Sequence, residues 1–116
     1  MEPITYMFDV VNRNVVTIKP KQPIVDWINA IYPEIPEDGS ETSAYLIKAY
    51  DDPADIEKWL RKNFGRIFEN ELNERHQDED DWPKNRTWKL FNAWFDTSVS
   101  AVVYDIEEGA IRKSGA

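Results

Sequence analysis

The chain has 116 residues, the common size of one domain. Its 41% hydrophobic content, with five Trp, five Tyr and five Phe, suits a packed core rather than a disordered chain. The lack of Cys excludes a disulfide framework, a cysteine zinc site and a thiol nucleophile, and the formal charge of −8 argues against nucleic-acid binding. With only short apolar runs and no basic, apolar leader at the amino end, we expect a cytoplasmic protein that does not bind membranes.

The first predicted strand covers residues 14–19, which are rich in β-branched side chains. Residues 8–11 are predicted to pair with it as a hairpin, because Asn12 and Arg13 between them suit a tight turn. A short helix is predicted next. Its apolar residues recur at helical spacing between Pro23, which suits a helix start, and Pro33, which ends it: Ile24, Trp27, Ile28 and Ile31.

A loop with two prolines and Asp38-Gly39 follows over residues 33–42. Residues 43–50 are apolar on both faces, which predicts a strand in the interior of the sheet. The longest helix is predicted from Pro53, capped by Asp52, with apolar residues three and four apart as far as Leu72.

A third helix is predicted from Trp82 and Pro83, followed by a strand over residues 97–105 and a flexible tail over 107–116. The order is β-α-β-α-α-β, preceded by one more strand if residues 8–11 pair. We therefore predict a single α+β domain over residues 1–116, with three helices packed on one face of a three- or four-stranded mixed sheet.

Charge is strongly segregated between residues 69 and 95. The first half contains seven acidic residues and a single arginine, and the second half contains Lys84, Arg86 and Lys89 without any acid. Carboxylates beside His76 are of the type that binds divalent metals, but their spacing matches neither His-Glu-x-x-His nor a calcium loop. The favoured interpretation is a solvated acidic connector without metal or cofactor. The alternative is a metal site in a small hydrolase, formed by Glu71, His76, Asp78 and Asp80.

Two residues of this region need separate interpretations. His76 is the only histidine, hence the only candidate imidazole base, yet its polar neighbours favour an exposed residue without a catalytic role. Helical projection places Glu71 on the apolar face of the long helix, where a buried carboxylate would mark a site. The favoured alternatives are that the helix ends near Glu69, or that Glu71 pairs with Arg75 one turn later.

The polar side of the third helix is the predicted binding surface. A guanidinium beside an aromatic ring suits carboxylates or a protein partner. The residues of this surface are Trp82, Asn85, Arg86, Lys89 and Asn92. The alternative is that the same cations neutralise the acidic residues within the chain. No catalytic residue is predicted, because the chain lacks a glycine-rich phosphate loop and a nucleophile elbow.

Three motifs resemble a family of short, acidic, uncharacterised bacterial proteins. They are Val-Asn-Arg at residues 11–13, Lys-Pro-x-x-Pro-x-x-Asp-Trp-Ile at 19–28, and Trp-Pro-x-x-Arg-x-x-x-x-Phe-x-x-Trp-Phe at 82–95. The resemblance covers roughly residues 11–106 and implies that residues 1–10 are an extension. Members of that family carry an aromatic-rich stretch where this chain has residues 75–78, so the resemblance implies no role for His76. It also implies no activity.

We therefore expect a non-enzymatic protein that binds another protein through the surface between Trp82 and Asn92 and the acidic residues before it. The alternative is the metal-dependent hydrolase described above. A third interpretation, an inhibitor whose acidic run imitates nucleic acid, fits the local charge but not the mild charge of the remaining chain. The sequence determines neither the partner nor the oligomeric state.

Overall fold

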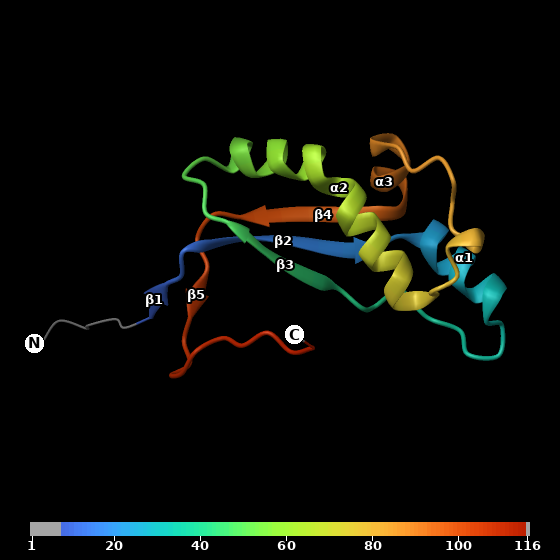
Figure 1. Ribbon diagram of the computed structural model, residues 1–116, viewed down its shortest axis with the longest axis horizontal. Coiled ribbons are helices and arrows are strands. Elements are labelled where there is room, and N and C mark those ends of the chain that lie inside the picture. Colours follow the sequence, from blue (N-terminus) through green and yellow to red (C-terminus); the bar gives the residue numbers. More distant parts are fainter. Residues whose placement is uncertain (1–7, 116) are drawn as a thin grey trace, which may run out of the picture.

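Figure 1 shows the computed structural model of the chain, in which residues 8–115 are described. The elements in chain order are β1 (Asp9–Val10), β2 (Arg13–Pro20), α1 (Gln22–Ile31), β3 (Ser43–Lys48), α2 (Pro53–Arg75), the 3-10 helix η1 (Glu79–Asp81), α3 (Trp88–Trp94), β4 (Phe95–Ser100) and β5 (Tyr104–Asp105). This order confirms the predicted α+β class.

The main sheet has three strands in the order β3-β2-β4, with β2 in the centre. Both pairings are antiparallel, so the prediction of a mixed sheet is wrong. The prediction that residues 43–50 form an interior strand is also wrong, because β3 is an outer strand. Apolar composition alone is misleading here, since Leu46 faces away from the helices and is 47% exposed.

The predicted hairpin between residues 8–11 and β2 does not form. Instead β1 pairs with β5 as a separate antiparallel ribbon, with Val10 opposite Tyr104, and the Val11 amide donates to the Val103 carbonyl. The chain passes from β1 into β2 without reversing, so the ribbon projects beyond one end of the main sheet (Figure 1). The strand predicted over residues 97–105 is accordingly divided into β4 and β5.

Helices α2 and α3 cover one face of the main sheet, and α1 lies at the end where β2 finishes (Figure 1). Alternate residues of β2, including Val16 and Ile18, are fully buried beneath them. The aromatic centre of the core is Phe68 of α2, whose ring lies 5.4–5.7 Å from the rings of Phe91, Trp94 and Phe95. This packing joins the long helix to α3 and β4.

Helix α2 begins at Pro53 as predicted, whereas α3 begins later than predicted. Asp52 caps α2 as expected, accepting from the Ala54 amide at 2.9 Å, but the helix continues to Arg75. Helix α3 begins at Trp88 rather than Trp82, because Thr87 caps it by accepting from the Leu90 amide. None of the helices in residues 8–115 has the length and apolar character needed to cross a membrane.

Candidate functional site

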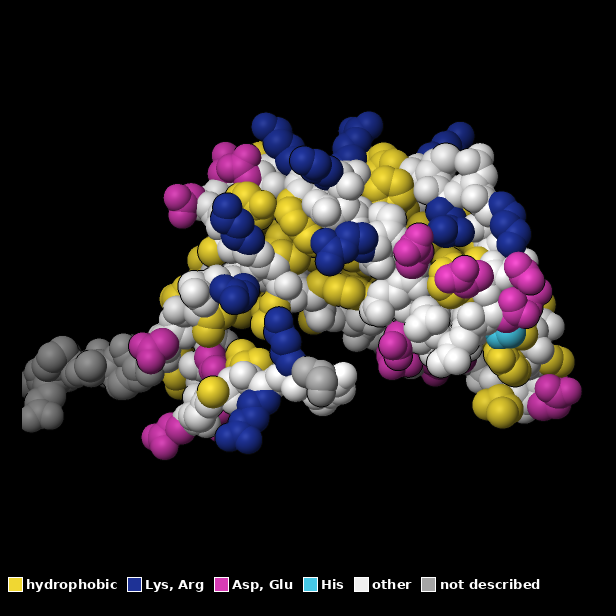
Figure 2. All heavy atoms as spheres, in the orientation of Figure 1, with side chains coloured by type: hydrophobic (Ala, Val, Ile, Leu, Met, Phe, Trp, Pro, Cys, Tyr) yellow, Lys and Arg dark blue, Asp and Glu magenta, His cyan; other side chains and the backbone are white. Residues whose placement is uncertain are grey.

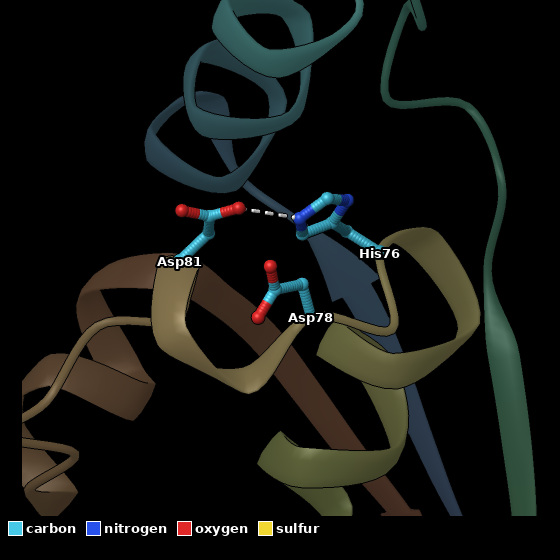
Figure 3. A group of neighbouring side chains, drawn as sticks. All are labelled: His76, Asp78 and Asp81. Atoms are coloured by element: carbon cyan, nitrogen blue, oxygen red, sulfur yellow. Dashed lines mark hydrogen bonds and ion pairs between the residues drawn. The ribbon is translucent and has the colours of Figure 1, made fainter.

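His76 and two aspartates gather where α2 ends. His76 is the first residue after the helix, and η1 turns Asp78 and Asp81 back towards its ring (Figure 3). His76 Nε2 lies 2.8 Å from Asp81 Oδ2, and Nδ1 lies 2.8 Å from the Tyr32 hydroxyl. One ligand atom from each of His76, Asp78 and Asp81 lies within 4.8 Å of the others. These three residues are the metal-binding candidates of the described chain.

The residues of this cluster form several hydrogen bonds within the chain. Both ring nitrogens of His76 have hydrogen-bond partners, and the Asp78 carboxylate accepts from the Asp80 amide at 3.0 Å. A metal ion on Nε2 would replace the hydrogen bond to Asp81, and the hydrogen bonds of His76 connect the ends of α1, α2 and η1. Of the predicted ligands, His76 and Asp78 come together here, whereas Asp80 contributes only its backbone. Asp81 was not among the predicted ligands, because the spacing of residues in the sequence does not show that η1 turns Asp81 towards His76.

Glu71 forms a separate network. It is buried within α2, where it accepts hydrogen bonds from the hydroxyls of Tyr45 and Ser43, and it pairs with Arg75 at 3.3 Å. The predicted pairing with Arg75 is thus confirmed, and the prediction that the helix ends near Glu69 is wrong. Burial and the neighbouring Glu71 carboxylate raise the pKa of the Tyr45 hydroxyl. Glu71 therefore links α2 to β3 and does not belong to the histidine cluster.

The surface predicted around the third helix is largely engaged within the chain. Trp82 is only 7% exposed, because its ring packs against the core and its indole N–H donates to the His76 carbonyl. The Arg86 guanidinium donates to Glu69 and to the Pro83 carbonyl, and it lies over the Trp82 ring. Asn92 is half-buried and donates to the Trp88 carbonyl. Asn85 and Lys89 remain exposed. The predicted partner contact at this surface stays a prediction.

A groove of different character runs between β3 and α2. One part, of about 270 Å³, is lined by residues 45–48 with Trp59, Arg66 and Ile67 of α2. The second part, of about 640 Å³, is lined by Tyr50, Asp55, Lys58, Trp59, Lys62 and Asn63. Trp59 borders both parts, so they are adjacent, and we call them together the β3–α2 groove. Consecutive residues of β3 line it, which means that it follows the outer edge of the strand.

The groove is basic and aromatic. Its cations are Lys48, Lys58, Lys62 and Arg66. None of the four forms an ion pair with another residue in the described part of the chain, whereas Lys21, Arg75 and Arg86 each pair with an acidic side chain. Figure 2 shows dark blue and yellow side chains together over α2 and β3, and magenta side chains near both ends of α2. The cations of the groove therefore lie between the acidic residues at the two ends of α2, and Asp55 is the one acidic residue in the lining.

A sequence signal for this groove exists. Lys58, Lys62 and Arg66 recur every four residues, which places them along one side of α2, and Trp59 lies beside the first of them. The segregation of charge between residues 69 and 95 obscures this weaker pattern. The contribution of β3 has no local signal, because only the strand order shows that its edge is open.

The chain has no significant match among family models, curated proteins or solved structures. The resemblance to short, acidic bacterial proteins stays a prediction.

Proposed function

We propose that this protein is a non-enzymatic module that binds another protein, and that the β3–α2 groove is its docking site. The observation that carries the proposal is an open strand edge bordered by four cations that have no ion-pair partner within residues 8–115. Edge strands in monomeric proteins are normally covered or shortened because they pair readily with other chains. Here the edge lies beside a groove with an aromatic floor, an arrangement suited to recognition.

The composition of the groove supports binding rather than catalysis. Its lining contains no histidine and no serine, so it lacks the imidazole base and the serine nucleophile of a serine-hydrolase site. Trp59 and Arg66 are of the residue types that most often dominate interface energy. We place this function in the cytoplasm, where a chain without cysteine is suited to the reducing conditions.

The test compares two charge-reversed surfaces on one chain. Lys62→Glu with Arg66→Glu changes the groove, and Lys84→Glu with Lys89→Glu makes the same charge change beside and on α3. Tagged parent and both variants are used to purify partners from the native host, after circular dichroism has shown that all three are folded. We expect a partner that copurifies with the parent and with the α3 variant but is lost with the groove variant. Loss with the α3 variant alone, or retention with both, would overturn the groove assignment.

A metal-dependent hydrolase is the second candidate, and the grouping of His76, Asp78 and Asp81 is the observation that favours it. Its test is calorimetric titration with Mn²⁺ and Zn²⁺ of the parent, of His76→Ala and of Asp80→Ala. A tight, stoichiometric site that is lost only in His76→Ala would support the hydrolase. Because both ring nitrogens of His76 already have hydrogen-bond partners, we expect weak binding that added salt abolishes.

A further inference from the structure

We infer that the ligand of the β3–α2 groove is an acidic protein segment in extended conformation, which adds to β3 as a fourth strand of the main sheet. This inference rests on the proposed function and names the class of partner that the groove would take. It follows from three features of the groove: the backbone edge of β3, the charge of the lining and the place of Trp59.

The first feature is the backbone edge. An outer strand directs the N–H and C=O groups of alternate residues away from the sheet, where a further strand can bond them. β3 pairs with β2 on one side over Ser43–Lys48, and within residues 8–115 no backbone of another segment hydrogen-bonds to its other side. The edge offers about 20 Å of strand, at about 3.3 Å for each residue, which matches a ligand of about six residues.

The second feature is charge, which decides what kind of strand is accepted. Lys62 and Arg66 project from α2 along the groove, and Lys48 lies on β3 itself. Asp55 is the only acidic residue in the lining. A lysine on an edge strand discourages pairing with most other strands, including another copy of the same edge. An acidic strand instead binds more tightly because the same cations attract it. The lining therefore selects its ligand by charge, in addition to the backbone hydrogen bonds that the edge of β3 offers.

The third feature is the apolar floor between the cations. Side chains of an added strand alternate between the two faces of the sheet, and those on the α2 side would meet Trp59 and Ile67. The preferred segment therefore has acidic and apolar residues in alternation. Single-stranded nucleic acid also binds aromatic and basic grooves, but it cannot use the backbone edge of β3, and the chain carries a net charge of −8.

The test uses a fluorescent six-residue probe of alternating glutamate and valine, measured by anisotropy on the full chain. Three competitors accompany it: the same peptide with alternate backbone amides methylated, a lysine–valine peptide, and a six-nucleotide oligothymidylate. Hydrogen exchange of the amides of residues 45–48 is measured with and without the probe. The protein variants are Lys62→Glu with Arg66→Glu in the groove, and Arg112→Glu as the exposed control in the carboxy-terminal segment.

We expect the glutamate–valine peptide to bind, to slow amide exchange in β3, and to weaken by about tenfold or more on amide methylation, on groove charge reversal or in added salt. Arg112→Glu should leave the dissociation constant unchanged. Equal binding of the methylated peptide would exclude strand addition, and tighter binding of the oligothymidylate through the same cations would make the ligand a nucleic acid. If the probe does not bind while the copurified partner still depends on Lys62 and Arg66, the inference fails and the proposed function stands. If binding of the copurified partner does not depend on Lys62 and Arg66, the proposed function itself is wrong.

Discussion

The Tyr45 hydroxyl and the Glu71 carboxylate connect the groove strand to the helix above it. Tyr45 donates to Glu71 and accepts from the Asn70 side chain at 2.9 Å, while Arg75 balances the charge of the buried carboxylate. Tyr45 also borders the groove. Because a half-buried phenol next to a carboxylate resists ionisation, its protonation couples folding stability to pH.

The first prediction concerns this coupling. The pKa of Tyr45 is raised in the folded state above its usual value near 10, so the unfolded chain loses the proton first as pH rises. The stabilisation is therefore complete below pH about 10 and is lost progressively above it. We expect urea unfolding between pH 9 and about 11 to show a steeper loss of stability for the parent than for Tyr45→Phe.

Tyr104→Phe is the matched control, because Tyr104 is 58% exposed on β5 and should leave the pH dependence of the parent unchanged. An equal slope in the parent and in Tyr45→Phe would show that the Tyr45–Glu71 bond does not govern this dependence.

At the level of elements, the stability of the short helix α3 depends little on the intrinsic helix propensity of its residues. It covers only Trp88–Trp94, too short to form alone in water. Thr87 caps its first turn, and Phe91 is fully buried with its ring 5.2 Å from that of Phe95. Trp94 packs at 6.1 Å from Trp27 of α1 and 5.7 Å from Phe68 of α2. The helix is therefore stabilised mainly by its aromatic contacts.

The second prediction follows from these contacts. Trp94→Ala removes the ring that joins α1, α2 and α3, and it should lower the free energy of unfolding by about 3 kcal/mol. Lys89→Ala, an exposed change on the same helix, should stay within about 0.5 kcal/mol of the parent. Urea denaturation of both variants measures the difference. A Trp94→Ala variant as stable as Lys89→Ala would show that the interhelical packing contributes little.

For the molecule as a whole, the main sheet is stabilised by more strand pairing and burial than the β1–β5 ribbon. Central β2 is bonded on both sides and is covered by helices on one face. The ribbon has two residues in each strand, and its side chains Val10, Tyr104 and the neighbouring Ile106 are more than half exposed. Asp9 also lies opposite Asp105, which weakens the pairing. An isolated ribbon of this kind is marginally stable in water.

The third prediction is that the ribbon opens independently of the domain. The Val11 amide, bonded to Val103 at 2.8 Å, should exchange with solvent about a thousandfold faster than the amides of Val16 and Ile18 in β2. Residue-resolved hydrogen exchange measures this ratio, with intrinsic rates used for normalisation. Similar protection at all three positions would mean that the ribbon unfolds together with the main sheet.

The amino-acid sequence by itself determined the α+β class, the core side of α2 and the Asp52 cap, because helical periodicity and capping are local properties. It also predicted the pairing of Glu71 with Arg75 as one of two favoured alternatives, whereas the burial of Glu71 is shown by the structure. Only the tertiary structure decided that β1 pairs with β5, that β3 is an outer strand and that Trp82 is buried. These outcomes depend on contacts between segments far apart in the chain, and the periodicity of one segment carries no information about which edge stays open. The β3–α2 groove depends both on the local sequence and on the tertiary structure. The alignment of Lys58, Lys62 and Arg66 follows from helical spacing, and the open strand edge follows from the order of the strands in the sheet.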